Sequence, residues 1–289
     1  MERLDEAIGV IGGSGLCGME GLEPIEEVEV ATPFGAPSDH YIVGKIEGRL
    51  VVFLARHGRT HRLLPHELNY RANLFGFKKL GVQRIVSVSA VGSLKEDIHP
   101  LHIVVPDQFF DRTRHRADTF FGDGVVVHVG FGDPVCPQLH GALCHAAAAS
   151  GATVWPGGTY VCMEGPAFST RAESQVYRSW GASVIGMTNL PEAKLAREAE
   201  MCYATLALVT DFDCWHEAEE AVTQQDVLQN MQANVATAQR TLRALVASLG
   251  RERSCACGDA LRSAFARPPG QAPAAARERL DIIIGKYLQ

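Results

Sequence analysis

Two acidic residues at one strand end have the spacing of a proton-transfer pair. Asp211 and Asp213 directly follow residues 203–210, an apolar run typical of a buried strand. Residues two apart project on one face while the chain stays extended, so the two carboxyl groups would lie close together. Because two close carboxylates do not easily ionise together, the pKa of one rises, and that group can act as a general acid near neutral pH. An acidic turn that caps the next helix is the alternative, and the motif alone favours it.

A basic pair, Arg56 and His57, follows another apolar run at residues 50–55. In open α/β sheets, ligands bind beyond the carboxyl ends of the strands. The planar guanidinium of an arginine suits an anion, and an imidazole can add a further hydrogen bond. The pair therefore predicts an anion site, with a solvated basic loop as the alternative.

Glycines follow the first apolar run, residues 7–11, in the pattern Gly13-Ser-Gly-Leu-Cys-Gly18. A dinucleotide site with this pattern needs a helix that begins on the glycines and faces a pyrophosphate. Residues 18–24 contain two glycines and a proline, which disfavour a helix, so the sequence argues against a dehydrogenase. A tight turn and a small anion-binding loop, built on backbone N–H groups and the Ser14 hydroxyl, are equally supported.

Three more apolar runs end in residues that could line a pocket. Residues 87–93 are small and would let a ligand approach the backbone closely, although small residues also form ordinary turns. Residues 163–169 carry Glu164 and Phe168, which could equally be a loop carboxylate and a core residue. Residues 186–188, Gly-Met-Thr, end a further run. Each motif is weak alone, but all of them lie at predicted strand ends.

Apolar and helical patterns alternate along the chain, which predicts an α/β fold with a sheet flanked by helices. Several apolar runs lack polar alternation, as expected of strands covered on both faces. The predicted strands are residues 7–11, 50–55, 84–90, 102–106, 125–129, 159–163, 183–187 and 203–210. The predicted helices are residues 65–80, 136–150, 169–180, 191–200 and 224–249. Residues 1–250 are expected to form one domain, and residues 251–289 a tail with a helical end.

The composition excludes several classes of protein. The 289 residues include 27 lysines and arginines and 33 aspartates and glutamates, a net charge of −6, which argues against binding to nucleic acid or anionic membranes. No apolar run reaches the ~18 residues of a membrane helix, and the acidic N-terminus does not resemble a secretory signal. The eight cysteines are scattered, unlike a disulfide framework. We therefore expect a soluble, cytoplasmic, globular protein.

The sequence predicts no metal site. Cys255 and Cys257 are one residue apart, closer than the usual C-x₂₋₄-C spacing of a zinc pair. We expect them to be two reduced surface thiols, with a redox or stabilising role as the alternative. A zinc site of His57, His61 and His66 is weakly supported, because Pro65 breaks any continuous helix there.

Taken together, the motifs resemble the trimeric class of nucleoside phosphorylases, most closely the branch that cleaves 5′-methylthioadenosine. The resemblance covers residues 7–250 and rests on Ile11-Gly-Gly-Ser-Gly-Leu16, Thr32-Pro-Phe-Gly-x-Pro-Ser38, Leu54-Ala-Arg-His-Gly58, Asn69-Tyr-x-Ala-Asn73, Glu164-Gly-Pro166, Arg171-Ala-Glu173, Gly186-Met-Thr188 and Thr210-Asp-Phe-Asp-Cys-Trp215. It implies a single-domain fold with a central mixed β-sheet flanked by helices, and a homotrimer or a dimer of trimers. It also implies phosphate-dependent cleavage of 5′-methylthioadenosine to adenine and 5-methylthioribose 1-phosphate.

The resemblance further implies a role for each site residue. Asp211 and Asp213 would be the catalytic pair that reads the adenine edge, one of them protonating N7. The phosphate would be held by Ser14, Arg56, His57, Ser89, Ala90 and Thr188. The nucleoside would be held by Phe168 on the base, Met187 on the ribose, and Val227 and His128 around the 5′-substituent, with His128 supplied by a neighbouring subunit. No metal or organic cofactor is implied, because inorganic phosphate is a co-substrate.

Two features depart from the family pattern. Serine stands at positions 14 and 89, where threonine is frequent, but the hydroxyl donor is kept. Gln224 lies one helical turn before Val227, where the family often has an apolar residue. The preference for a 5′-methylthio group over a 5′-hydroxyl group is therefore open.

Three alternatives remain. A purine nucleoside phosphorylase acting on adenosine or 6-oxopurine nucleosides is the nearest, although its 6-oxopurine branch typically has asparagine in place of Asp211. A nucleoside-binding protein without catalysis is the second. A nucleoside hydrolase is the third, but it would carry acidic metal ligands near the N-terminus, where this chain has glycines.

Overall fold

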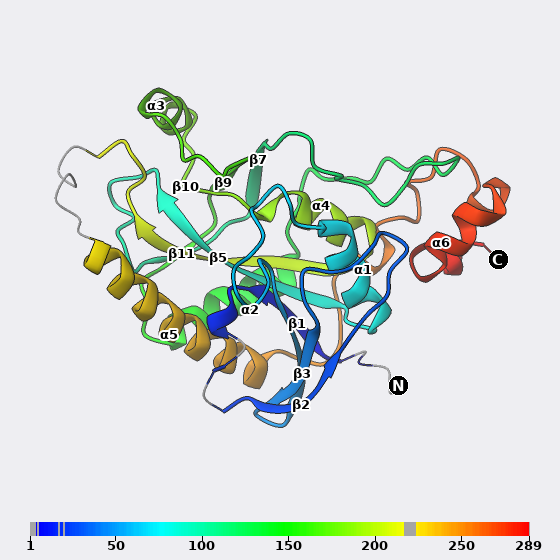
Figure 1. Ribbon diagram of the computed structural model, residues 1–289, viewed down its shortest axis with the longest axis horizontal. Coiled ribbons are helices and arrows are strands. Elements are labelled where there is room, and N and C mark those ends of the chain that lie inside the picture. The colour runs from blue at the N-terminus through cyan, green and yellow to red at the C-terminus, as the bar shows by residue number, and fades with distance from the viewer. Residues whose placement is uncertain (1–3, 5, 17, 20, 217–223, 289) are drawn as a thin grey trace.

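The computed structural model describes residues 4, 6–16, 18–19, 21–216 and 224–288. Within these residues, eleven strands form one mixed sheet, which confirms the predicted fold class (Figure 1). The strands are β1 (Ile8–Gly12), β2 (Glu23–Val28), β3 (Tyr41–Ile46), β4 (Arg49–Ala55), β5 (Arg84–Ser93), β6 (Ile103–Val105), β7 (Gln108–Arg112), β8 (Val154–Pro156), β9 (Thr159–Met163), β10 (Val184–Gly186) and β11 (Cys202–Asp211). The order along the sheet is β2-β3-β4-β1-β5-β10-β9-β7, and β11 links β5 to a branch of β6 and β8.

Strand β5 is the branch point of the sheet. On one edge, β11 runs parallel to it, from Cys202 beside Arg84 to Asp211 beside Gly92. On the other edge, β1 pairs with residues 84–87 and β10 with residues 92–93. Among the described strands, residues 88–91 of β5 therefore have no partner on that edge. The end of β1 lies beside this gap, so a ligand there can approach the β5 backbone.

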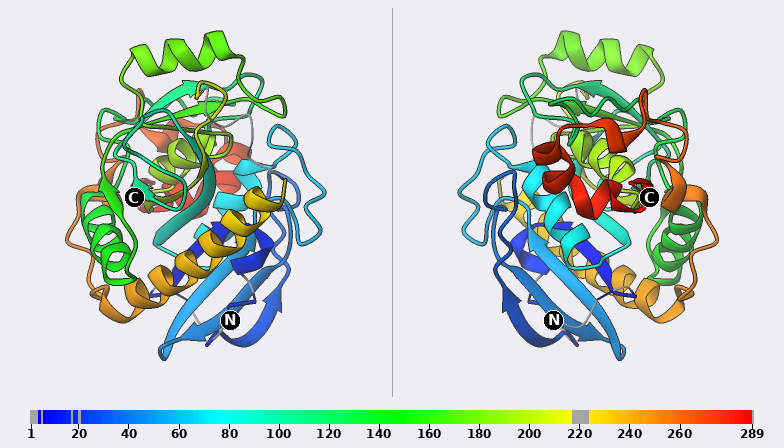
Figure 2. Two further views of the ribbon diagram at one scale, coloured as in Figure 1. Left: turned by 90° about the vertical axis from the view of Figure 1, so that its left-hand side faces the viewer. Right: turned by 90° about the vertical axis from the view of Figure 1, so that its right-hand side faces the viewer.

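Helices cover both faces of the sheet, which explains why its central strands are apolar throughout. The helices are α1 (Tyr70–Lys79), α2 (Pro137–Ala149), α3 (Arg171–Ser179), α4 (Asn189–Glu198), α5 (Gln224–Ser248) and α6 (Ala274–Ile284). α2 and α5 pack together on one face, whereas α1, α4 and α6 cover the other (Figure 2). Successive strand residues alternate between the two layers: Val10 packs with α2 and α5, and Ile11 with α1 and α4.

The predicted elements are confirmed except for one strand. Residues 125–129 do not form a strand, and their pairing is limited to isolated bridges such as that of Val127 with Phe265. Glycines flank this segment, and it lies along the chain's own tail instead of joining the sheet, with Val125 buried and Val126 exposed. The sequence also missed the polar or short strands β2, β3, β7 and β8.

The tail packs against the main body. Leu280 and Ile284 of α6 are buried in the same core cluster as Leu74 of α1. The prediction that Cys255 and Cys257 are surface thiols is wrong, because Cys257 is only 5% exposed and Cys255 is half-buried. The chain after α5 turns back against the sheet, which buries both residues. Within the described residues, no helix is long and apolar enough to cross a membrane.

Candidate active site

A cavity of about 120 Å³ lies at the end of β1, beside the gap in the pairing of β5. Its walls come from the glycine-rich loop, β5, β11 and α5: Gly13, Gly15, Leu16, Val88, Ser89, Ala90, Leu208, Thr210, Met231, Asn234 and Val235. The structure thus brings Ser89 and Ala90 together with the glycine-rich loop, as the strand-end argument predicts. The sequence placed Met231 and Val235 only on the apolar stripe of a helix, and Asn234 was missed.

The glycine-rich loop forms a tight turn. Residues Ser14–Leu16 form one turn of 3₁₀-helix, in which the Leu16 N–H donates to the Gly13 carbonyl at 3.2 Å. A side chain at Gly12 would collide with Leu16 and with Val88 of β5, so glycine is needed for this close approach. In the described part of the loop no α-helix begins, which agrees with the argument against a dinucleotide site. The Ser14 side chain lies outside the described part of the structure.

Arg56 is buried beside the ends of β1 and β5. Its Nε and Nη2 atoms lie 2.5 Å and 3.2 Å from the two carboxylate oxygens of Glu192, which is also fully buried. Nη1 donates to the carbonyl of Val88 at 3.0 Å, and Nη2 also donates to the carbonyl of Ile11 and the hydroxyl of Ser87. Burial, the largest single influence, would lower the pKa of Arg56, but the charge and the hydrogen bonds of Glu192 together outweigh burial and raise it. Among the described contacts, one N–H of Nη1 is left for a phosphate.

His57 is held as a neutral ring. Its Nδ1 atom lies 2.8 Å from the carbonyl oxygen of Leu63, which can only accept, so Nδ1 carries the proton. Burial, with a smaller contribution from the charge of Arg56, lowers the pKa of His57 to about 4. At neutral pH its Nε2 atom is therefore an acceptor, which suits a protonated phosphate oxygen.

This lowered pKa predicts a pH-dependent stability. The folded protein resists protonation of His57 down to about pH 4, whereas the unfolded chain binds the proton near pH 6.5. Stability from this residue is therefore complete above pH 6.5 and falls as the pH drops toward 4, by about 2 kcal/mol at pH 5. The free energy of unfolding, measured with urea at pH 7 and pH 5, should therefore fall by about 2 kcal/mol less in His57→Asn than in the unchanged protein. His61→Asn, which changes the ring stacked on His57 at 4.5 Å, should show the same fall as the unchanged protein; equal pH dependence in all three proteins would contradict the assignment.

Thr188 and Ser89 are joined through the start of α4. Thr188 is the buried N-cap residue of α4, and its hydroxyl makes no capping hydrogen bond. Ser89 donates from its hydroxyl to the side-chain oxygen of Asn189 at 3.2 Å. The Asn189 amide in turn donates to the hydroxyl groups of Tyr203 and Thr205. Thr188 and Asn189 are thereby held beside β5, just before Leu190, whose φ of −117° and ψ of 133° interrupt the helix.

The acidic pair lies beyond the end of β11. The chain does not stay extended as predicted, because Asp213 has a positive φ of 51° and begins a turn. The Asp211 carboxylate accepts hydrogen bonds from the Thr210 hydroxyl at 2.6 Å and from the Asp213 backbone N–H at 2.8 Å. A side chain at Gly92 of β5 would contact both residues, so the two acids still lie together. Burial and, secondarily, the charge of Asp211 raise the pKa of Asp213, although hydrogen bonding by Ser174 opposes them. The group whose pKa is raised is Asp213.

The loop after β9 carries the predicted base-stacking residue. Phe168 is 79% exposed, so no described side chain holds it and its ring is free to cover a ligand. Met187 lies against this loop, because a side chain at Gly165 would collide with its sulfur atom. The Cys214 thiol donates to the carbonyl of Ser169 at 3.2 Å, which ties the loop to the acidic pair.

Arg116 is a site residue that the sequence analysis missed. Its side chain is 2% exposed, and Nη1 donates to the carbonyls of Met187 and Leu190, both at 2.7 Å. Nη2 donates to the carbonyl of Glu164 at 2.6 Å, and Nε lies 3.3 Å from the Glu164 carboxylate. Arg116 therefore holds together the Phe168 loop and the Met187–Thr188 segment. It stands in an irregular segment with no motif, so only the fold identifies it. Glu192, the partner of Arg56, was missed because it lies inside a helix.

Of the predicted site residues with described side chains, Ser89 and Ala90 line this cavity, whereas the others, His128 among them, do not. The backbone N–H of His128 donates to the carbonyl of Ala264, and this described contact fixes its segment to the tail of its own chain. Its imidazole is exposed. The side chain of Val227 lies outside the described part of the structure, although α5 passes the cavity one turn later at Met231.

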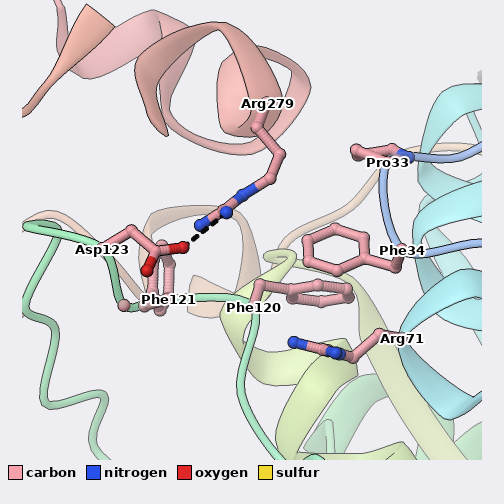
Figure 3. A pocket seen from close by; sticks show the side chains of 8 residues that line it. Pro33, Phe34, Arg71, Phe120, Phe121, Asp123 and Arg279 are labelled. Atoms are coloured by element: carbon pink, nitrogen blue, oxygen red, sulfur yellow. Dashed lines mark hydrogen bonds and ion pairs between the residues drawn. The ribbon is translucent and has the colours of Figure 1, made fainter. Parts of the chain in front are cut away.

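A larger cavity of about 490 Å³ lies apart from these residues (Figure 3). It is lined by Pro33, Phe34, Arg71, Phe120, Phe121, Gly122, Asp123 and Arg279. Figure 3 shows Arg279 of α6 reaching Asp123, a 2.6 Å ion pair, across from Phe34. None of the predicted site residues lines it, so volume alone would misplace the active site.

Comparisons with known proteins agree with this geometry. The model of the phosphorylase superfamily matches residues 7–247. The S-methyl-5′-thioadenosine phosphorylase of Geobacter sulfurreducens is 59% identical over 99% of this chain and 100% of its own length, and that of Koribacter versatilis is 58% identical over 97% and 96%. Among solved structures, a methylthioadenosine phosphorylase from an Antarctic soil metagenomic library is 48% identical with a TM-score of 0.93, covering 96% of this chain and 99% of its own. A methylthioadenosine phosphorylase from Schistosoma mansoni in complex with adenine is 36% identical with a TM-score of 0.81, covering 86% and 93%. The chain therefore belongs to the phosphorylase superfamily, within its family of S-methyl-5′-thioadenosine phosphorylases.

Proposed function

We propose that this protein cleaves 5′-methylthioadenosine with inorganic phosphate and produces adenine and 5-methylthioribose 1-phosphate. The observation that carries the proposal is the layout along β5. Ser89 and Ala90 border the glycine-rich cavity, and Gly92 touches the acidic pair. Ser89 and Gly92 are three residues apart, about 10 Å along an extended strand, which leaves room for a sugar between a phosphate and a purine edge.

The phosphate is held mainly by dipoles. We assign Ser14, Arg56, His57, Ser89, the Ala90 backbone N–H and Thr188 to this site. Because Arg56 is paired with Glu192 and His57 is neutral, these two residues bring little net positive charge. The glycine-rich loop supplies backbone N–H groups, which favour an anion at this position.

The reaction separates charge between the sugar and the base. A phosphate oxygen forms a bond to C1′ while the bond from C1′ to N9 breaks and its electron pair goes to the purine. Positive charge then develops on the sugar, next to the anionic phosphate, and negative charge develops on the base. A carboxylic acid that donates its proton to N7 neutralises the base, which is worth about 10²–10⁴-fold in rate. The reaction needs no metal or organic cofactor.

Asp213 and Asp211 have different roles in the recognition of adenine. We assign the proton donor at N7 to Asp213, because burial and the neighbouring Asp211 raise its pKa, which eases protonation of this carboxyl. Asp211 is fixed as an acceptor by the two hydrogen bonds that its carboxylate receives, and it can accept another from the 6-amino group. Phe168 covers the base, and Met187 packs against the ribose.

The 5′-group determines which nucleoside is preferred. The relatives named as S-methyl-5′-thioadenosine phosphorylases support a methylthio group, with Val227 and a partner subunit's His128 segment near it. A solved relative described as an adenosine/methylthioadenosine phosphorylase supports adenosine as a second substrate. Profiling methylthioadenosine, adenosine, inosine and methylthioinosine, each with and without phosphate, tests the assignment. We expect phosphate-dependent release of base, fastest for methylthioadenosine. Equal rates with and without phosphate would contradict phosphorolysis.

We further propose a homotrimer in which each active site is completed by a neighbour. The segment 124–131 exposes apolar surface, including Val126, which is 48% exposed, and His128 lies on the same segment. A ring of three copies places one such segment at every interface and closes on itself. Light scattering at assay concentration should give three chains or a multiple of three. A fully active monomer would contradict this arrangement.

Arg116 gives a prediction about nucleoside binding. Arg116→Lys keeps the charge but cannot reach the carbonyls of Glu164, Met187 and Leu190 together, so the Phe168 loop loses its attachment. We expect the KM for methylthioadenosine to rise about tenfold, since loosely held binding groups cost roughly 1–2 kcal/mol. Steady-state kinetics with each substrate varied in turn should show a much smaller change for phosphate. Arg114→Lys, at an exposed position in the same segment, is the matched control; equal effects of the two changes would contradict the role of Arg116.

A further inference from the structure

Four cysteines from three distant parts of the chain meet at the opposite end of β11 from the active site. They are Cys136, Cys202, Cys255 and Cys257, and their sulfur atoms all lie within 4.8 Å of one another. Cys136 is the N-cap of α2, Cys202 is the first residue of β11, and the other two belong to the tail. Three of the four are buried.

The spacing of the sulfur atoms suits metal coordination. The Cys202 and Cys255 sulfur atoms are 3.3 Å apart, well beyond the ~2.05 Å of a disulfide bond. Four thiolates at ~2.3 Å from a tetrahedral zinc ion lie about 3.8 Å from each other. A small adjustment of the side chains would therefore place all four sulfur atoms around one ion.

The tail explains how a C-x-C pair can contribute two ligands. Cys255 has an extended backbone, with φ of −89° and ψ of 159°, and a 3₁₀ turn begins at Ala256. This change of direction brings the sulfur atoms of Cys255 and Cys257 to one side, despite the short spacing. The spacing of Cys255 and Cys257 alone argues against a zinc site, but the fold supplies Cys136 and Cys202 as two further ligands.

We propose that these four cysteines bind one zinc ion as a structural site. Four thiolates fill the coordination of zinc and leave no position for substrate, which is the pattern of structural sites. β11 has ten residues, so the cluster lies about 30 Å from Asp211, too far to take part in the reaction. The ion would fasten the tail to α2 and to the start of β11.

The surroundings can support the charge of such a centre. Binding releases four thiol protons and leaves two net negative charges on the zinc and its thiolates. The Leu139 N–H at the first turn of α2 points at the Cys136 sulfur at 3.4 Å, and the helix dipole favours negative charge there. The buried Arg84 donates to the carbonyls of Arg251 and Glu252, which fixes the chain just before Cys255. A side chain at Gly258 would collide with the guanidinium of Arg253, so a second cation lies against the residue after Cys257.

Metal analysis of the full-length protein tests the proposal. The protein is purified with a phosphine reductant and without chelators or metal-affinity resin, incubated with zinc chloride and freed of excess metal. Mass spectrometry of the elements should then give about one zinc per chain. Cobalt in place of zinc should produce the strong visible absorption of a tetrahedral cobalt thiolate. Removal of the zinc should lower the melting temperature by roughly 5 °C or more.

Variants separate this cluster from the other cysteines. Cys136→Ser and Cys255→Ser should each lose the zinc, whereas Cys144→Ser, at a half-buried position on the same helix as Cys136, should keep it. If the cluster variants do not fold, titration of the unchanged protein with a mercurial reagent should release the zinc, detected with a coloured chelator. Less than a tenth of a zinc per chain after this treatment would overturn the proposal. So would a thiol count, without reductant, that shows four of the eight cysteines paired in disulfides.

Discussion

Asp213→Asn should lower kcat for methylthioadenosine by about 10²–10⁴-fold, the range for loss of a general acid. The raised pKa of Asp213 favours its protonated form, and an amide at this position cannot transfer a proton to N7. The KM for phosphate should change only a few-fold, because the phosphate cavity lies on the other side of the sugar. Initial rates at saturating phosphate, with circular dichroism to establish folding, provide the measurement.

Asp211→Asn is the matched variant of the neighbouring acid, and it should change base selectivity. In the proposed site, the Asp211 carboxylate would accept from the 6-amino group of adenine but would face the O6 oxygen of a 6-oxopurine without a proton between them. Buried polar groups left unpaired cost roughly 1–3 kcal/mol, about one to two decades in rate, so adenosine should be preferred over inosine. An asparagine amide can donate to O6, so the variant should shift toward inosine. Equal kcat/KM of the unchanged protein for inosine and adenosine would contradict this role and favour a purine nucleoside phosphorylase.

Removal of the Arg56 side chain should raise the KM for phosphate and lower kcat, because the nucleophile would be weakly bound and misplaced. The structure adds a second consequence. Arg56→Ala leaves the buried carboxylate of Glu192 without its partner, which typically costs about 3–5 kcal/mol of stability. Chemical unfolding of Arg56→Ala should therefore show a large loss, in addition to the kinetic defect.

A double variant separates these two effects. Arg56→Met with Glu192→Gln removes both charges, so it should recover much of the stability that Arg56→Ala loses. The KM for phosphate should stay high in the double variant, since the remaining N–H of Arg56 is gone. Phosphate kinetics equal to those of the unchanged protein in a folded double variant would remove Arg56 from the phosphate site.

The sequence predicted the parts of the fold that depend on local patterns. Strands such as β1, β5 and β11 are largely apolar and buried along nearly their whole length, and α5 carries an apolar stripe, so their sequence patterns identified them. Segments whose burial depends on distant partners were harder to predict from the sequence. Residues 125–129 are as apolar as a strand but form only isolated bridges, such as that of Val127 with Phe265 of the tail, and β2 is polar because it lies at an edge of the sheet.

In the candidate site, too, residues in local motifs were predicted, whereas residues whose role depends on distant contacts were not. Motifs at strand ends located Ser89, Ala90, Thr188 and the acidic pair, because the carboxyl ends of strands meet at one edge. The direction of each side chain could not be predicted. Arg56 faces Glu192 as well as the phosphate site, and Arg116 has no local pattern, since its role consists of contacts with three separate segments. The four cysteines were missed as a group for the same reason.

Phosphorus NMR of the reaction mixture distinguishes phosphorolysis from hydrolysis. The protein is incubated with methylthioadenosine and a limiting amount of phosphate, and adenine is measured in parallel by chromatography. We predict that the phosphate signal is replaced by that of a sugar 1-phosphate, in an amount equal to the adenine released, and that addition of the isolated products regenerates methylthioadenosine. Release of adenine with the phosphate signal unchanged and free methylthioribose as the product would show hydrolysis and would contradict the account.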